Sequence, residues 1–193
     1  MSNLNIMIVG VGGQGTLLAS RLLGNVAMKQ GYDVKVSEVH GMSQRGGSVV
    51  TYVKMGEKVY SPIIEKGEAD FLLAFENLEA LRWIDYLKKG GTLVLNDQRI
   101  DPMPVIIGKV KYPETIIERL KEGGVCMESI DALNIAKECG NIKAVNMVLI
   151  GLLAKTTNIS REIWLEAMGE VIPQKILNVN VKAFNAGYDS NIM

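Results

Sequence analysis

The sequence predicts an α/β fold: a Rossmann-like, mostly parallel sheet flanked by helices, with a β-hairpin addition and a helical C-terminal part. Three observations support this prediction. Short apolar runs alternate with segments of helical periodicity in the first half of the chain, a pattern typical of βαβ units. The glycine-rich stretch G-V-G-G-Q-G joins the first apolar run to the first helical segment. Helical periodicity then dominates the C-terminal part.

Length and composition predict one globular domain over residues 1–193. The chain is 48% hydrophobic and 22% charged, and its formal net charge of zero argues against a nucleic-acid-binding face. The longest apolar helical stretch, A-V-N-M-V-L-I-G-L-L-A-K, is shorter than the roughly 20 residues that span a bilayer. No basic segment precedes an apolar run at the N-terminus. We therefore expect a cytoplasmic protein.

The first half of the chain supplies the predicted sheet. Residues 4–9 predict a buried strand, 14–29 a helix, and 33–39 a second strand. Gly31 suits the left-handed position that follows a helix. The β-branched residues of 48–55, followed by G-E-K and V-Y-S, predict a hairpin. Residues 69–75 and 92–96 predict central strands, and the helix between them, 78–89, is expected to stop at Gly90 and Gly91.

The second half is predicted to be mainly helical. Residues 101–114 contain three prolines and predict an irregular stretch, followed by a short helix over 116–121 and a strand over 125–128. Further helices are predicted over 129–139, 142–155, 160–171 and 173–186. Ser129 and Ser160 are candidate N-caps, and Pro173 suits a first helical position.

The first candidate site is the glycine turn. Its residues match G-x-G-x-x-G between a strand and a helix, where a free helix N-terminus favours an anion. A dinucleotide site also needs an acidic residue at the end of the second strand, and Glu38 is the one candidate. Another polar ligand, a protein contact and a purely structural turn remain alternatives. We expect a positive φ at Gly12, so that Gly12→Val would damage the turn. The candidate cofactor-binding residues are Gly10, Gly12, Gly13, Gln14 and Gly15.

The second candidate site is the loop after the second strand. Such loops lie at the carboxyl edge of a sheet, so we expect this loop beside the glycine turn. The guanidinium of Arg45 suits a carboxylate or phosphate, although a surface salt bridge would explain it equally simply. His40 is the only histidine, and an ordinary loop role is the simpler interpretation. The candidate substrate or partner residues are His40, Gly41, Ser43, Gln44, Arg45, Gly46 and Gly47.

Other polar residues offer weaker candidates. The pairs Glu76-Asn77 and Asn96-Asp97 follow predicted strands and either line the same edge or cap helices. Asn146 lies inside an apolar helix and is expected to be buried and hydrogen-bonded. The chain has two cysteines and one histidine, too few for four-cysteine iron–sulfur or zinc ligation, so we predict no metal site.

Several motifs together resemble a known family. The segments I-M-I-V-G-V-G-G-Q-G-T, E-A-D-F-L-L-A-F-E-N-L-E-A-L and N-M-V-L-I-G-L-L-A-K resemble the gamma-type component of 2-oxoacid:ferredoxin oxidoreductases. The loop V-H-G-M-S-Q-R-G-G-S-V is similar to that of the indolepyruvate ferredoxin oxidoreductase beta subunit. The resemblance covers roughly residues 5–188.

The resemblance implies a subunit of a complex that decarboxylates aryl-2-oxoacids with coenzyme A. The products are acyl-CoA, carbon dioxide and reduced ferredoxin. Thiamine diphosphate and iron–sulfur clusters would belong to the alpha subunit, and this chain would be inactive alone. Its two loops would face substrate, CoA or the partner subunit. The alternatives are a subunit acting on another 2-oxoacid (pyruvate, 2-oxoglutarate or a branched-chain acid), a free-standing NAD-dependent dehydrogenase, and a regulatory nucleotide- or CoA-binding module.

Overall fold

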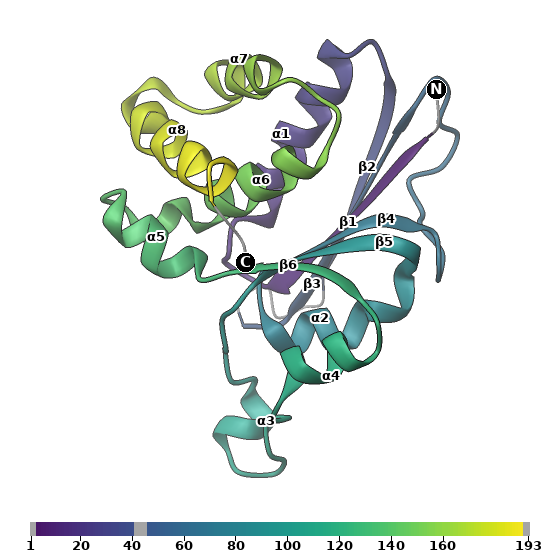
Figure 1. Ribbon diagram of the computed structural model, residues 1–193, viewed down its shortest axis with the longest axis vertical. Coiled ribbons are helices and arrows are strands. Elements are labelled where there is room, and N and C mark those ends of the chain that lie inside the picture. Colours follow the sequence, from purple (N-terminus) through teal and green to yellow (C-terminus); the bar gives the residue numbers. More distant parts are fainter. Residues whose placement is uncertain (1–2, 41–45, 191–193) are drawn as a thin grey trace.

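The structure is a computed structural model that describes residues 3–40 and 46–190. A twisted sheet lies between two groups of helices (Figure 1), so the predicted α/β class is confirmed. In the described residues the sheet has six strands, in the order β2-β3-β1-β4-β5-β6. They are β1 (Leu4–Val11), β2 (Asp33–His40), β3 (Ser48–Gly56), β4 (Ala69–Ala74), β5 (Leu87–Asn96) and β6 (Cys126–Ile130).

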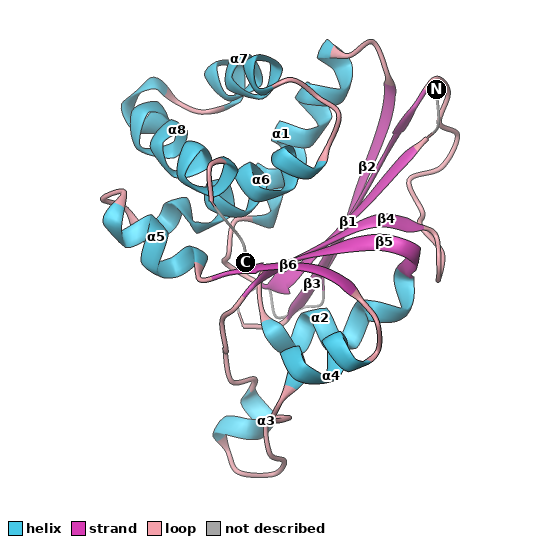
Figure 2. Cartoon of the chain, in the orientation of Figure 1, coloured by secondary structure: helices cyan, strands magenta, loops and turns pink. Residues whose placement is uncertain are grey.

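Helices cover both faces of the sheet. One face carries α1 (Thr16–Lys29), α5 (Ala132–Glu138), α6 (Val145–Thr156), α7 (Arg161–Val171) and α8 (Gln174–Tyr188), whereas the other carries α2 (Asn77–Trp83) and α4 (Ile116–Glu122) (Figure 2). The short helix α3 (Met103–Ile106) projects beyond α4 (Figure 1). Short 3₁₀ turns occupy Ile84–Tyr86 and Ile142–Ala144. No helix in the described ranges is long and apolar enough to cross a membrane.

The central strands are buried on both faces because their apolar residues alternate between two cores. In β1, Ile6 and Ile8 contribute to the core beneath α1 and α6, while Met7 and Val9 contribute to the core beneath α2 and α4. This explains why the strand reads as a continuous apolar run rather than an alternating one.

The sheet is parallel except at β3. Strands β1, β4, β5 and β6 pair in parallel, and β3 is antiparallel to both β1 and β2. One edge of the sheet therefore contains the last residues of β1, β2, β4, β5 and β6, together with the first residue of β3. We call this edge the carboxyl edge.

The prediction of a hairpin over residues 48–61 is wrong about which segments pair. Its second arm, V-Y-S, is not a strand, and β3 pairs with β1 and β2 instead. Val49, Val50, Val53 and Met55 of β3 are buried, which an interior strand allows. The backbone N–H of Val59 instead donates to the Asp33 carboxylate at 3.0 Å, fixing the segment after β3 beside β2.

The predicted helix over 78–89 also ends earlier than expected. The α-helix stops at Trp83, and β5 already begins at Leu87. Gly90 and Gly91 lie inside β5, opposite a register shift in β4. Gly90 has a φ of 78°, and a Cβ on Gly91 would lie 2.9 Å from the Asp70 carbonyl oxygen. The glycine pair therefore permits a bulge-like irregularity between two strands rather than ending a helix.

Other helix ends differ from the prediction by smaller amounts. Ser129 belongs to β6, and the cap of α5 is Asp131, whose side chain accepts a hydrogen bond from the Asn134 backbone at 3.0 Å. Ser160 is at the N-cap position of α7, as predicted, but its side chain makes no capping hydrogen bond, and Pro173 is the N-cap of α8 rather than its first residue. Gly31 has the predicted left-handed conformation, with a φ of 75°.

Candidate functional site

The glycine turn lies at the carboxyl edge, between β1 and α1. Positive φ angles occur at Gly13, at 106°, and at Gly15, at 86°, where Gly15 is the N-cap of α1. The positive φ predicted for Gly12 is wrong, since Gly12 is not among the glycines in that region. The left-handed backbone of the turn is therefore at Gly13 and Gly15, where glycine is the favoured residue.

Gln14 holds the turn against two neighbouring strand ends. Its Oε1 accepts a hydrogen bond from the Val11 backbone at 2.7 Å, and its Nε2 donates to the Phe75 carbonyl at 3.0 Å. Nε2 also lies 3.4 Å from Oε1 of Gln98. A Cβ on Gly10 would lie 2.9 Å from the Gln14 side chain and 3.0 Å from Phe75 Cβ, so glycine at this position permits the close approach. The Gln14 hydrogen bonds and the absence of a side chain at Gly10 thus stabilise the conformation of the turn.

The second loop returns to the glycine turn, as the sequence predicts. The Gly12 N–H donates to the Gly47 carbonyl at 2.8 Å, and the Gly46 N–H donates to the Gly12 carbonyl at 3.3 Å. The backbone of His40 pairs with Val49 at the end of β2. The other candidates of this loop, Gly41, Ser43, Gln44 and Arg45, lie outside the described residues.

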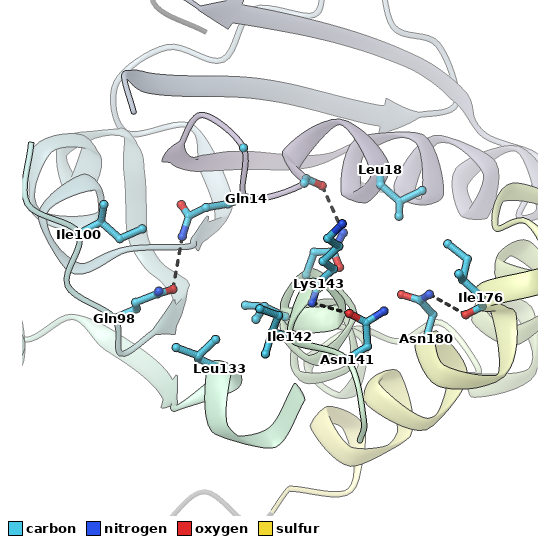
Figure 3. Close-up of a pocket in the computed structure, with 14 residues that line it drawn as sticks. Gln14, Leu18, Gln98, Ile100, Leu133, Asn141, Ile142, Lys143, Ile176 and Asn180 are labelled. Carbon is cyan, nitrogen blue, oxygen red and sulfur yellow. Dashed lines mark hydrogen bonds between the residues drawn. The ribbon is translucent and has the colours of Figure 1, made fainter. Parts of the chain in front are cut away.

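An open cleft of about 730 Å³ lies on the α1 face of the glycine turn. Figure 3 shows residues of the turn, α1, the β5–α3 segment, α5, the α5–α6 connection and α8 gathered around it. The lining combines apolar side chains, carboxamides and one cation. The apolar residues are Leu18, Ile100, Leu133, Ile142, Val145 and Ile176, the carboxamides are Gln14, Gln98, Asn141, Asn146 and Asn180, and the cation is Lys143.

This lining suits a long ligand with apolar and polar parts and one anionic group. The N-terminus of α1 begins at the cleft with no acidic residue in its first turn, so its free N–H groups add to the positive potential of Lys143. Sequence reasoning found Gln14 and Gly15 but missed Lys143 and Asn180. Lys143 lies in the 3₁₀ turn Ile142–Ala144 and Asn180 lies in α8, and no local motif predicts that these segments line the cleft.

A second groove, of about 410 Å³, lies on the other side of the turn, between Thr16, Glu38 and Val49. Glu38 is exposed, and its Oε2 lies 3.5 Å from the Thr51 hydroxyl. In a dinucleotide-binding fold the strand that bears the ribose-holding acid is adjacent and parallel to the first. Here β3 lies between β1 and β2, so β2 and Glu38 stand two strand spacings, about 9–10 Å, from β1, which is one spacing further than a dinucleotide site requires.

The polar pairs at the ends of β4 and β5 make hydrogen bonds to neighbouring segments. Glu76, not Asn77 or Asp97, caps α2, and its Oε2 accepts from the Glu79 backbone at 2.9 Å. Asn77 Nδ2 instead donates to Asp97 Oδ1 at 2.9 Å. The Asn96 Nδ2 donates to the Phe75 carbonyl at 3.1 Å.

Asn146 is buried and hydrogen-bonded, as predicted. It is 3% exposed, and its Nδ2 lies 3.4 Å from the Gly15 carbonyl. Both cysteines are free, with Cys126 exposed and Cys139 partly exposed. Across residues 3–40 and 46–190, no three His, Cys, Asp or Glu side chains are grouped to hold a metal ion.

Comparison with known proteins supports the family suggested by the motifs. The model of the pyruvate ferredoxin/flavodoxin oxidoreductase family matches residues 5–190. The indolepyruvate oxidoreductase subunit IorB of Thermococcus kodakarensis is 46% identical, over 97% of this chain and 95% of that protein. The subunit of the same name from Pyrococcus horikoshii is 45% identical, over 97% and 95% of the two chains.

A solved structure shows the same fold. The gamma subunit of a keto/oxoacid ferredoxin oxidoreductase from Geobacter sulfurreducens aligns with a TM-score of 0.72 and 24% identity, over 96% of both chains. With a family model that matches nearly the whole chain and relatives at 45–46% identity over almost its full length, this chain belongs to the pyruvate ferredoxin/flavodoxin oxidoreductase family.

Proposed function

We propose that this chain, as a single domain over residues 1–193, is the small subunit of an indolepyruvate-type 2-oxoacid:ferredoxin oxidoreductase. The complex decarboxylates an aryl-2-oxoacid, transfers the acyl group to the thiol of coenzyme A, and passes the released electrons to ferredoxin. The observation that carries the proposal is the similarity to indolepyruvate oxidoreductase subunits over nearly the whole chain. We assign the complex to the cytoplasm.

The electron-transfer groups are assigned to the partner. Iron–sulfur clusters commonly need four thiolates, and this chain has two cysteines, which lie on β6 and just after α5. Its residues therefore do not fit a cluster. We assign the clusters and thiamine diphosphate to the alpha subunit, which carries the redox chemistry when they are bound.

The role of this chain is to complete the site at its carboxyl edge. We assign the cleft beside the glycine turn to CoA, because its apolar side chains and carboxamides suit the pantetheine arm and its one lysine suits a phosphate. Lys143 is exposed at this cleft and makes no ion pair with the carboxylates of the described residues. Its ammonium is placed to pair with a phosphate of CoA. The loop from His40 to Gly47 would face the oxoacid or the partner.

Reconstitution tests the proposal. The chain and its thiamine-bearing partner are assayed separately and together for acyl-CoA formation and viologen reduction, with indolepyruvate, pyruvate, 2-oxoglutarate and a branched-chain oxoacid. We expect activity only in the mixture and the highest kcat/KM with indolepyruvate. Turnover by the isolated chain would refute the subunit role, and preference for another oxoacid would refute the substrate assignment.

Two substitutions test the placement of the site. Lys143→Ala should raise KM for CoA by about tenfold, as expected for one lost charge-assisted contact. Lys121→Ala, in α4 on the opposite face, serves as the matched control. Arg45→Ala should lower activity of the complex without changing stability, since we assign Arg45 to a loop contact with an anion or the partner subunit. An unchanged KM in Lys143→Ala would remove the cleft from the CoA site.

A further inference from the structure

Two glutamates of α2 are buried beneath the loops that meet at the carboxyl edge. Glu76 is 1% exposed and Glu79 is 4% exposed. A carboxylate removed from water is costly unless hydrogen-bond donors replace the solvent. Two of them within one helical turn therefore need a dense set of donors, and the structure supplies three to each.

Glu79 receives its donors from β3 and from its own helix. The Ser48 hydroxyl donates to Oε2, the Trp83 Nε1 donates to the same oxygen at 3.3 Å, and Arg82 Nη1 donates to Oε1 at 2.8 Å. Arg82 and Trp83 lie one turn further along α2. Ser48 is different, because it is the first residue of β3 and directly follows Gly46 and Gly47.

Glu76 receives one donor from α2 and two from the chain after β5. Its Oε1 accepts from the Ile100 backbone N–H at 3.1 Å and from the Tyr112 hydroxyl, and its Oε2 accepts from the Glu79 N–H at 2.9 Å. Ile100 lines the large cleft together with Gln98. Helix capping accounts only for the bond to Glu79 N–H, whereas the other two bonds join Glu76 to Ile100 and Tyr112, which lie outside α2.

The connected hydrogen bonds lead directly to the glycine turn. Glu79 holds Ser48, and the adjacent Gly47 carbonyl accepts from the Gly12 N–H at 2.8 Å. We propose that Glu79 and Glu76 are positioning residues of the site: Glu79 fixes Gly47 and Ser48 against the glycine turn, and Glu76 fixes the segment at Ile100 that borders the cleft. Neither carboxylate lines the cleft.

The most selective test removes the Ser48 hydroxyl, because Ser48→Ala leaves Arg82 and Trp83 bonded to Glu79. Ser20→Ala is the matched control, since the Ser20 hydroxyl donates to the Leu17 carbonyl within its own helix, α1. Amide hydrogen exchange is measured on the full-length chain of each variant. In Ser48→Ala we expect roughly fivefold or faster exchange at the Gly12 and Gly46 amides, with β1 and β4 unchanged.

The same variants are then assayed in the reconstituted complex, a measurement that rests on the proposed function. Ser48→Ala should raise KM for CoA or oxoacid several-fold with little change in kcat, and Ser20→Ala should leave both unchanged. Glu79→Gln should loosen the same two amides, and Ser48→Ala added to it should have little further effect.

Unchanged exchange at Gly12 and Gly46 in Ser48→Ala would overturn the proposal. Equal acceleration at the amides of β1 and β4 would also overturn it, because the pair would then serve only general stability. The exchange measurement needs no partner subunit. Its result can therefore be interpreted even if the activity assay refutes the proposed function.

Discussion

The side-chain amide of Asn146 donates a hydrogen bond to the carbonyl oxygen of Gly15, at 3.4 Å, although the two residues are 131 positions apart. Asn146 lies in the first turn of α6, and Gly15 is the N-cap of α1. Its Oδ1 also accepts from the Met147 backbone at 2.9 Å. Through this contact the C-terminal helices hold one end of the glycine turn.

Gly15→Ala should therefore destabilise the chain and disturb the cleft. A Cβ on Gly15 would lie 2.7 Å from Asn146 Nδ2, and the residue has a φ of 86°. We expect a loss of about 2 kcal/mol or more in the free energy of unfolding, because the left-handed conformation alone costs roughly 1–2 kcal/mol. Denaturant unfolding measures the loss.

Gly13→Ala provides the comparison. Gly13 has a φ of 106°, but nothing lies within 4 Å of its hypothetical Cβ. The conformational cost alone, about 1–2 kcal/mol, is expected there. If both variants lost the same stability, the contact between Asn146 and the turn would contribute no steric constraint.

Helices α6 and α8 cross with their backbones in contact at two glycines. A Cβ on Gly151 would lie 2.0 Å from the Phe184 carbonyl oxygen, and one on Gly187 would lie 1.9 Å from the Val148 carbonyl oxygen. Backbone atoms cannot yield as a side chain can. Gly151→Ala should thus force the helices apart and cost at least the roughly 1–3 kcal/mol typical of an overpacked core.

Gly169→Ala is the matched control for that substitution. Gly169 is an exposed residue of α7 with nothing within 4 Å of a hypothetical Cβ. Alanine there should raise the free energy of unfolding by up to about 1 kcal/mol, because it favours a helix more than glycine does. Thermal unfolding of both variants checks the opposite signs, and stabilisation by Gly151→Ala would contradict the close crossing.

The sequence was sufficient for the fold class and for the meeting of two loops. The glycine turn and the residues 46–47 could be predicted to adjoin because strands of a parallel sheet end at one edge. The interior position of β3 could not be predicted, since its apolar residues suit either a hairpin arm or a central strand. Likewise, the sequence predicts that Gly90 and Gly91 end a helix, whereas the pairing of β5 with β4 shows that they lie inside β5.

The candidate site was predicted only where a local motif marked it. Lys143 and Asn180 line the cleft, but the sequence pattern around each predicts only a helix and not a binding residue. Glu79 has the pattern of an ordinary helical residue, yet its buried carboxylate accepts a hydrogen bond from Ser48, 31 positions earlier in the chain. Both features depend on tertiary packing, so no spacing rule would find them.

Asp33→Asn should change stability mainly at low pH. The hydrogen bond from the Val59 backbone, together with that from Lys35, lowers the pKa of the Asp33 carboxyl below its ordinary 3.8. The folded chain therefore favours the ionised form, and this contribution is present above pH 3.8 and lost as the pH falls through the lower folded value. Urea unfolding as a function of pH should show a smaller acid-induced loss of unfolding free energy in Asp33→Asn. An unchanged loss at low pH would contradict the role of the Val59 contact.

Glu79→Gln should have the opposite pH signature. Burial raises the pKa of the Glu79 carboxyl above its ordinary 4.5, although the Ser48 hydroxyl and Arg82 offset part of that effect. The folded chain therefore binds this proton more tightly than the unfolded chain. The favourable contribution is fully present below pH 4.5 and is lost as the pH rises through the folded pKa.

Glutamine cannot ionise, so the decline in unfolding free energy above pH 4.5 should be shallower in Glu79→Gln than in the unmodified chain. Asp33→Asn is the control, since it should leave this limb of the profile unchanged. The two profiles can be compared at constant ionic strength by urea unfolding. A decline of equal slope in Glu79→Gln and the unmodified chain would mean that the Ser48 and Arg82 contacts fully offset the burial of Glu79, contrary to the direction of its pKa.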